Sequence, residues 1–227
     1  MKRIAVIFDL DGTLFPDRIW KSLAKHYMKH LKGTLFLVKF YITHCHLWLL
    51  SRLRIYNRDK FDIKWMEDIA GLMSGLTETQ MQRLSFLIVK NDVLEKLRQD
   101  IMERLKEHKA KGHFIILASG AYQPLLNAIG SKIGADRCVG TALEFTNGRY
   151  TGRITKPFLL GREKAEKIKA FISQCWASTD LTLSYAYSDS IRDLPTLNLV
   201  GNPIVVYPDE QLELLAKQKG WDLSFLT

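Results

Sequence analysis

Two aspartates, spaced two residues apart, stand where a buried strand is expected to end. The apolar run at residues 4–8 is typical of a parallel strand buried on both faces, and Asp9-Leu10-Asp11-Gly12-Thr13 follows it directly. Ligands of open α/β sheets bind beyond the carboxyl ends of the strands, so both carboxylates would reach that crevice from one side. Gly12 permits the tight turn that brings backbone amides toward a phosphate. The pattern predicts two acids that share a hard cation beside an anionic group.

Three further segments place polar groups at comparable positions. Ser119 and Gly120 follow a second apolar run, and a hydroxyl beside backbone amides suits a phosphate oxygen. Lys164, near the start of an expected helix, would neutralise phosphate charge. Asp189, with Asp193 four residues later, follows a third apolar run and would complete an oxygen-ligand set for Mg²⁺. Each segment alone also suits a turn or helix cap, but their shared position at one edge of one sheet indicates a site.

The order of elements predicts how these residues are positioned. Residues 17–109 follow a helical period, with breaks near Gly33, Asn57, Gly71 and Gly75 that suggest four or five helices. Strands are expected at 114–118, 181–187 and 204–206, a hairpin with an Asn147-Gly148 turn within 138–153, and helices at 162–175 and 209–219. The sequence thus predicts an α/β protein: a Rossmann-like parallel-sheet core, residues 1–16 and 110–227, with a helical domain, residues 17–109, inserted after the first strand.

Composition narrows the class of protein. A chain of 227 residues with 47% hydrophobic and 25% charged residues is long enough for one core plus a modest insert, and is not typical of disorder. Its three cysteines have no zinc-ligand spacing, which favours a reducing, cytoplasmic setting. Of the net charge of +9, nearly all lies within residues 17–64. Such a basic stretch is either a solvated face or a contact for an anionic substrate or membrane. No signature of a nucleic-acid-binding fold is present.

One segment, residues 35–50, is apolar and rich in aromatic side chains. It is interrupted by Lys39, His44 and His46, and its apolar runs are shorter than the roughly 20 residues that a membrane span needs. A buried or amphipathic helix is therefore favoured. A helix lying on a membrane surface stays open as an alternative, because basic residues flank the segment on both sides: Lys29, Lys32, Arg52 and Arg54.

Four motifs carry a resemblance to a known family. FDLDGT at 8–13, LASG at 117–120, GREK at 161–164 and YSDSIRDLP at 187–195 resemble, in the usual order, the motifs of haloacid-dehalogenase-like phosphatases. The helical insert resembles the small cap, or substrate-specificity, domain of the phosphoserine-phosphatase-like branch, subfamily IB. The chain departs from the commoner GDGxND form, because Ser188 and Ser190 replace the glycines and Arg192 replaces the asparagine. Both acids of that motif are kept.

The resemblance implies a role for each motif residue. Asp9 would be the nucleophile that forms an aspartyl-phosphate, and Asp11 the general acid and base. The phosphate would be held by a set of small, hydroxyl and basic residues: Gly12, Thr13, Ser119, Gly120 and Lys164. The Mg²⁺ cofactor would be bound among four acids: Asp9, Asp11 (through its main-chain carbonyl), Asp189 and, in support, Asp193. Lys156 competes with Lys164 for the lysine role, and Lys164 is preferred because its GREK setting and its spacing to Asp189 suit the branch.

Three functions remain in competition. The first is a phosphatase of a small phosphorylated metabolite such as phosphoserine. The second directs the same chemistry at lipid head-group phosphates, of the lysophosphatidate or phosphatidylglycerophosphate type, at a membrane surface. The third is a non-catalytic module that binds anions or membranes, which the intact set of reactive residues disfavours. The motifs do not distinguish water from an alcohol as the phosphoryl acceptor, and the protein is expected to be a monomer or a homodimer.

Overall fold

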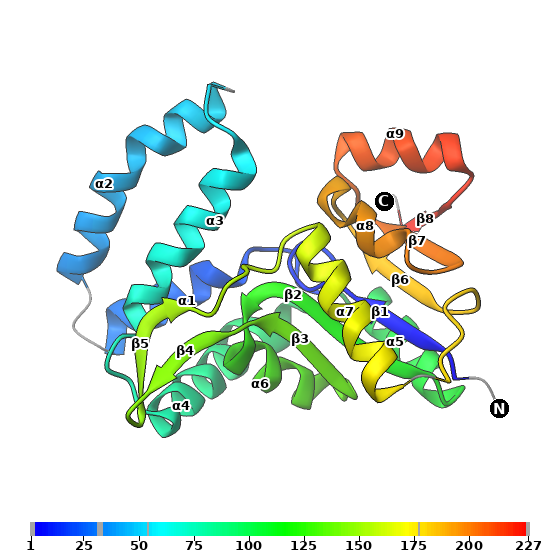
Figure 1. The fold of residues 1–227 in the computed structure, drawn as a ribbon, viewed down its shortest axis with the longest axis horizontal. Helices are drawn as coiled ribbons and strands as arrows, with labels where there is room; N and C mark the ends of the chain where they lie inside the picture. The colour runs from blue at the N-terminus through cyan, green and yellow to red at the C-terminus, as the bar shows by residue number, and fades with distance from the viewer. Residues whose placement is uncertain (1–2, 31–33, 54, 177, 226–227) are drawn as a thin grey trace.

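A parallel sheet forms the centre of the protein. The computed structural model describes residues 3–30, 34–53, 55–176 and 178–225 (Figure 1). Within them, six strands lie in the order β3-β2-β1-β6-β7-β8. Their bounds are β1 Ala5–Phe8, β2 Phe114–Tyr122, β3 Arg137–Thr141, β6 Tyr185–Ser188, β7 Asn202–Val206 and β8 Asp222–Phe225. Because the chain leaves β1 first toward β2 and later returns beside it as β6, the strand order reverses at β1. This switch point is where open α/β sheets bind ligands.

Helices cover both faces of the sheet. Alternate residues of β1 point to opposite sides: Val6 and Phe8 join the core cluster under α5 and α6, while Ala5 and Ile7 join the cluster under α7, α8 and α9. All four are at most 1% exposed, which explains why the strand is uniformly apolar. The helices span α5 Gln99–Ala110, α6 Gln123–Ile133, α7 Arg162–Cys175, α8 Leu194–Leu197 and α9 Glu210–Lys219. The predicted α/β fold is confirmed.

The insert between β1 and β2 consists, in its described part, of helices joined by short connections. Its longer helices are α1 Ile19–His30, α2 Thr34–Arg52, α3 Arg58–Ile69 and α4 Glu78–Ile88, and α5 follows them. Short turns of 3-10 helix occupy Ala70–Met73 and Leu94–Lys96 of the insert, and a π-helical turn occupies Val89–Val93; a further 3-10 turn, Ile191–Asp193, follows β6. Asn57 caps α3 through its side chain, and Thr77 with Gln80 forms a capping box on α4. The predicted break at Gly33 lies outside the described residues.

The insert has an anchored base and a projecting arm. Helix α4 packs on α6, and α5 contacts β2, so this part shares the large core cluster of the sheet. Helices α2 and α3 form a pair that stands away from the sheet (Figure 1); we call this pair, residues 34–69, the arm. The proposed division of the chain at 16/17 and 109/110 stays a prediction.

The predicted hairpin is confirmed in its turn and corrected in its extent. Strands β4 Leu143–Thr146 and β5 Arg149–Ile154 pair antiparallel, and Asn147 and Gly148 between them both have positive φ, 52° and 76°. The first residues assigned to that hairpin, however, form β3 and pair parallel with β2 instead. The hairpin is joined to the insert, since Tyr150 N–H donates to the Leu76 carbonyl and Gly75 N–H donates to the Tyr150 carbonyl.

Two further boundaries differ from the sequence-based expectation. The strand expected from residue 181 starts at Tyr185, because the Asp180 side chain accepts hydrogen bonds from Thr182 and closes a turn there. Strand β8 was not expected at all. As for membrane spans, none of the helices in the described part of the chain combines the length and the apolar character that crossing a bilayer requires.

The buried centre of the sheet gives a stability prediction. Leu117 in β2 is completely buried in the large core cluster, so Leu117→Ala should lower the free energy of unfolding by about 2–5 kcal/mol through lost burial and a cavity. Leu183→Ala, at a side chain that is 50% exposed, should change it by less than about 0.5 kcal/mol. Urea unfolding of both variants measures the difference, and equal effects would contradict the packing described here.

Candidate active site

The loop after β1 presents two carboxylates and has no room for a side chain at its turn. Asp9 follows β1 directly and Asp11 lies two residues on. Gly12 has φ 96°, a conformation that side chains other than hydrogen disfavour, and its N–H donates to the Phe15 carbonyl. A Cβ at Gly12 would overlap the Asp189 carboxylate. The glycine therefore allows the loops after β1 and β6 to approach each other.

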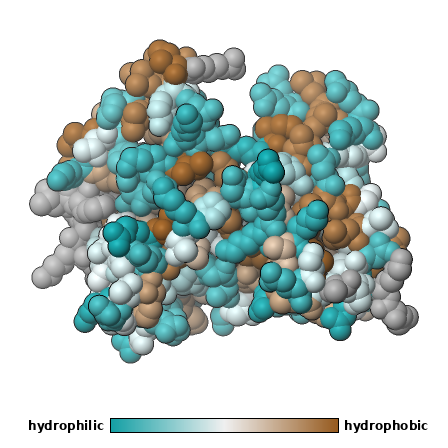
Figure 2. All heavy atoms as spheres, in the orientation of Figure 1, coloured by the Kyte–Doolittle hydropathy of each residue, from teal (hydrophilic) through white to brown (hydrophobic). Residues whose placement is uncertain are grey.

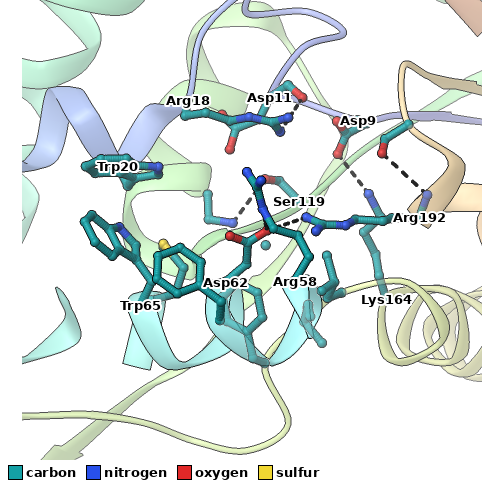
Figure 3. A pocket seen from close by; sticks show the side chains of 18 of the residues that line it. Asp9, Asp11, Arg18, Trp20, Arg58, Asp62, Trp65, Ser119, Lys164 and Arg192 are labelled. Carbon is teal, nitrogen blue, oxygen red and sulfur yellow. Dashed lines mark hydrogen bonds and ion pairs between the residues drawn. The ribbon is translucent and has the colours of Figure 1, made fainter. Parts of the chain in front are cut away.

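Lys164 links these loops to α7. Its Nζ donates to Asp9 Oδ1 at 2.8 Å (Figure 3) and lies 2.6 Å from Asp193 Oδ1. The other oxygen of Asp193 accepts a hydrogen bond from Ser188 Oγ at 2.7 Å. Burial alone would lower the pKa of Lys164, but Asp193 and Asp9 outweigh it and raise that pKa. The two acids therefore favour the charged form of Lys164, which lies between them.

Three aspartates at the strand ends have raised pKa values. Burial raises the pKa of Asp9 to about 6, although the Lys164 ammonium acts in the opposite direction. Burial and the negative charge of Asp9 raise the pKa of Asp11 to about 7, and the same two causes raise that of Asp189 to about 7. Acids that are crowded and desolvated together resist full ionisation. A cation among them would relieve the repulsion.

The donor set fits a hard divalent cation. Asp9 and Asp189 offer carboxylate oxygens and Asp11 a main-chain carbonyl, to which Arg18 Nη1 donates at 3.3 Å. Across the described residues, no group of three His, Cys, Asp or Glu side chains suffices to hold a metal. Mg²⁺ does not require one, because it commonly takes one or two carboxylates and completes its shell with waters and substrate phosphate. Asp193 is engaged by Lys164 and Ser188, which suits a supporting role.

The remaining predicted residues fall into two groups. Ser119 and Gly120, in the second half of β2, line the same cavity as Asp9 and Lys164. Thr13 is fully buried and its hydroxyl donates to Asp189 Oδ1 at 3.4 Å, so it contacts a site carboxylate rather than the cavity. The rival Lys156 has a side chain that is 79% exposed and lies 3.4 Å from Glu67. The structure therefore brings Lys164, and not Lys156, to Asp9.

The cavity has a polar and an aromatic side. Its volume is about 600 Å³, and it is lined by the strand-end residues together with side chains of the insert. Figure 3 shows Trp20 and Trp65 on the side opposite Asp9 and Lys164. The two indole rings meet edge to face with centroids 5.1 Å apart. The cavity is thus much larger than a phosphate group and extends from the acids toward the arm.

Arg192 joins the loop after β6 to the arm. Its Nε lies 2.8 Å from Asp59 Oδ1 and its Nη1 donates to Asp62 Oδ2 at 2.6 Å, and both acids belong to α3. Arg58 also approaches Asp62, at 3.6 Å. The sequence marked Arg192 only as a departure from the usual motif and gave no sign of Arg18 or Asp62. The Arg192–Asp62 pair is 130 residues apart in sequence, so no local spacing could have indicated it.

Comparison with known sequences identifies the family. The model of the haloacid dehalogenase-like hydrolase family matches residues 6–198. The chain belongs to the haloacid dehalogenase-like hydrolase family. The predicted family, and with it the predicted class of enzyme, a hydrolase, is confirmed. Among its relatives, phosphoserine phosphatase SerB1 of Mycobacterium tuberculosis is 26% identical over 229 residues, which cover 96% of this chain and 70% of that protein.

Solved structures share the haloacid dehalogenase-like fold. A protein of unknown function from Bordetella pertussis superposes with a TM-score of 0.83 at 22% identity and covers 98% of both chains. A phosphoserine phosphatase solved as a phospho-aspartyl intermediate analogue superposes with a TM-score of 0.61 at 18% identity, covering 94% of this chain and 91% of that one. At these identities the likeness establishes the fold of this hydrolase and not its substrate.

The Arg192 contacts yield a prediction for this hydrolase. A double-mutant cycle of Arg192→Ala and Asp62→Ala should give a coupling free energy of about 1 kcal/mol or more, because the pair is partly buried and hydrogen-bonded. The matched cycle of Arg162→Ala and Glu166→Ala, an exposed pair on α7, should give about 0.3–0.5 kcal/mol. Both cycles are measured by urea unfolding. If the two couplings are equal, Arg192 does not hold the arm.

Proposed function

We propose that the protein is a Mg²⁺-dependent phosphomonoester hydrolase that works through an aspartyl-phosphate on Asp9. The observation that carries the proposal is the arrangement around Asp9: a buried carboxylate held by the Lys164 ammonium, with Asp11 and Asp189 beside it, at the end of a cavity. Membership of a hydrolase family and the phosphatase activity named for the SerB1 relative agree with it. A non-catalytic binding module has no use for so complete a set.

The first half-reaction would proceed in line at phosphorus. The Asp9 carboxylate forms a bond to phosphorus while the bond to the leaving oxygen breaks, and Asp11 gives that oxygen a proton. Asp11 Oδ1 accepts the Ile19 N–H at 2.9 Å, so the proton belongs on Oδ2. The raised pKa of Asp11 allows it to hold this proton near neutral pH. Hydrolysis reverses the roles: Asp11 takes a proton from the attacking water, and Asp9 leaves as a carboxylate.

The groups around Asp9 would neutralise the negative charge of the nucleophile and of the phosphate. Lys164 would neutralise both the nucleophile and a phosphate oxygen, while the Ser119 hydroxyl and the Gly120 amide would bind the other oxygens. The Gly12 amide, also expected to bind phosphate, donates instead to the Phe15 carbonyl. Mg²⁺, held by Asp9, Asp189 and the Asp11 carbonyl, would offset the negative charge of the phosphate when bound. Thr13 and Asp193 would position Asp189 and Lys164, respectively, through the hydrogen bonds described above.

The substrate is proposed by class. The name of the SerB1 relative supports a small phosphorylated metabolite such as phosphoserine as the first candidate. The second candidate, a lipid head-group phosphate, is favoured by one observation, the aromatic side of the cavity. If the second candidate is the substrate, the protein would also contact an anionic membrane peripherally. A cytoplasmic location, water as the acceptor and a monomeric or homodimeric state complete the proposal.

Loss of the nucleophile tests the reaction. Asp9→Asn should lower kcat on p-nitrophenyl phosphate with Mg²⁺ by on the order of 10³-fold or more, because an amide cannot form the acyl phosphate. Asp17→Asn is the matched control, since that side chain is 47% exposed and pairs only with its neighbour Lys21 among the ion pairs of the described residues. It should keep the wild-type kcat. Substantial turnover by Asp9→Asn would refute the covalent mechanism.

Removal of the cation tests the cofactor. Treatment with a chelator should abolish hydrolysis of p-nitrophenyl phosphate, and added Mg²⁺ should restore it. Mg²⁺ should also raise the Tm of the wild-type protein, because a ligand that binds only the native state stabilises it. Asp189→Asn should lose most of this rise, since one of the two carboxylates is gone. A metal-independent wild-type enzyme would contradict the assignment.

A further inference from the structure

The aromatic side of the cavity reaches the outer surface of the protein. Tyr41 and Trp48 of α2 both line the cavity, and each is 46% exposed. The Tyr41 ring lies against Trp65, with centroids 5.8 Å apart, and Trp65 in turn contacts Trp20. A continuous series of rings therefore leads from the interior of the cavity to solvent.

Beyond these rings, α2 presents an apolar stripe to solvent. Val38, Ile42 and Leu49 on α2, and Leu53 directly after its last residue, are each 50% to 67% exposed. Their spacing places them on one side of the helix, opposite the buried Phe40 and next to Tyr41 and Trp48. We call these four residues the α2 stripe. Figure 2 shows hydrophobic side chains gathered at the apex of the arm. A contiguous exposed apolar surface of this kind marks a site of interaction.

Basic side chains flank the α2 stripe and indicate what covers it. Lys39 and Arg52 lie on α2 on either side of the stripe, and both are exposed. The Arg52 guanidinium lies 5.4 Å from the centre of the Trp48 ring. An apolar stripe with a basic border suits an anionic lipid surface. A second copy of the chain, packed symmetrically, would bring like positive charges together.

Two charged side chains on the arm side of the cavity, Asp62 and Lys21, are already in ion pairs, and Arg18 donates to the Asp11 main-chain carbonyl. Asp62 is shared by Arg192 and Arg58, and Lys21 is 2.6 Å from Asp17. A phosphorylated amino acid would need one partner for its carboxylate and another for its ammonium, so these ion pairs would have to be broken. An alkyl chain needs only an apolar wall, which the cavity provides.

We infer that the substrate is an amphiphilic phosphomonoester presented at an anionic lipid surface. Its phosphate reaches Asp9, its apolar part lies along Trp65 and Trp48, and the α2 stripe contacts the surrounding lipid. The inference rests on the proposed phosphatase reaction and chooses between its two candidate substrates. It assigns a role to the basic, aromatic stretch that the reaction itself leaves unused.

A chain-length series tests the substrate class. With Mg²⁺ and below the concentration at which micelles form, kcat/KM for octyl phosphate should exceed that for butyl phosphate by about tenfold or more, since each added methylene gains an apolar contact. Octyl phosphate should also be preferred over phosphoserine. Trp48→Ala should bring the octyl-to-butyl ratio toward one, while Leu214→Ala, at an exposed residue of α9, should leave the ratio unchanged.

The possible outcomes distinguish a wrong substrate class from a wrong reaction. Equal kcat/KM for octyl and butyl phosphate, or preference for phosphoserine, would overturn the amphiphile while leaving the phosphatase intact. If none of these esters, nor p-nitrophenyl phosphate, is hydrolysed in an Asp9-dependent way, the proposed function itself fails.

Vesicle flotation tests the surface. The full chain should float with vesicles of phosphatidylcholine and phosphatidylglycerol, and the Ile42→Glu/Leu49→Glu double variant should not. Leu214→Glu is the matched control at a side chain that is 57% exposed, and it should float like the wild type. Circular dichroism verifies that each variant is folded. A wild-type protein that does not float with the vesicles would overturn the lipid contact. A dimer in gel filtration that the double variant does not form would overturn it in favour of a second copy of the chain.

Discussion

The buried ammonium of Lys164 is the contact on which the site depends. It lies between Asp9, which follows β1, and Asp193, which follows β6, while Lys164 itself belongs to α7. A buried charge is costly unless it is paired, and removing either acid would leave an uncompensated ion in the interior. The parallel sheet brings these three segments to one edge. The fold therefore places the charged groups together, and their ion pairs in turn stabilise this arrangement of the loops.

The other loops are arranged around this ion pair network. Asp209, which caps α9, accepts hydrogen bonds from Ser190 Oγ and from the Ile191 N–H, each at 2.9 Å. Its own N–H donates to the Asp189 carbonyl at 2.7 Å. The segment with Asp189 and Asp193 is therefore fixed at both ends, by Lys164 and by Asp209. Such support holds reactive groups in place before any substrate arrives.

The features predicted correctly from the sequence are those that depend on residues close together in the chain. Asp9 and Asp189 follow apolar strands, and the helix expected at 162–175 has those bounds in the structure, because periodicity and strand-end position are local signals. β3 was assigned to the wrong partner because its pairing with β2 depends on contacts distant in sequence. The role of Arg192 was missed for the same reason: its acids lie on α3, about 130 residues earlier. The helical periodicity of the insert does not predict which of its acidic residues will contact the sheet domain.

The hydrogen bonds between the hairpin and the base of the insert restrict how the cavity can exchange its contents. Tyr150 exchanges two backbone hydrogen bonds with Gly75 and Leu76, and the Arg149 guanidinium donates to the Gly75 carbonyl at 2.7 Å. A rigid rotation of the whole insert would sever this seam, whereas bending the arm alone would leave it intact. Bending the arm would release the Arg192 pairs together with the hydrogen bond from the Tyr122 hydroxyl to the Met66 carbonyl and the Lys156–Glu67 ion pair. The rate of product release would then depend on how readily α2 and α3 bend away from the cavity.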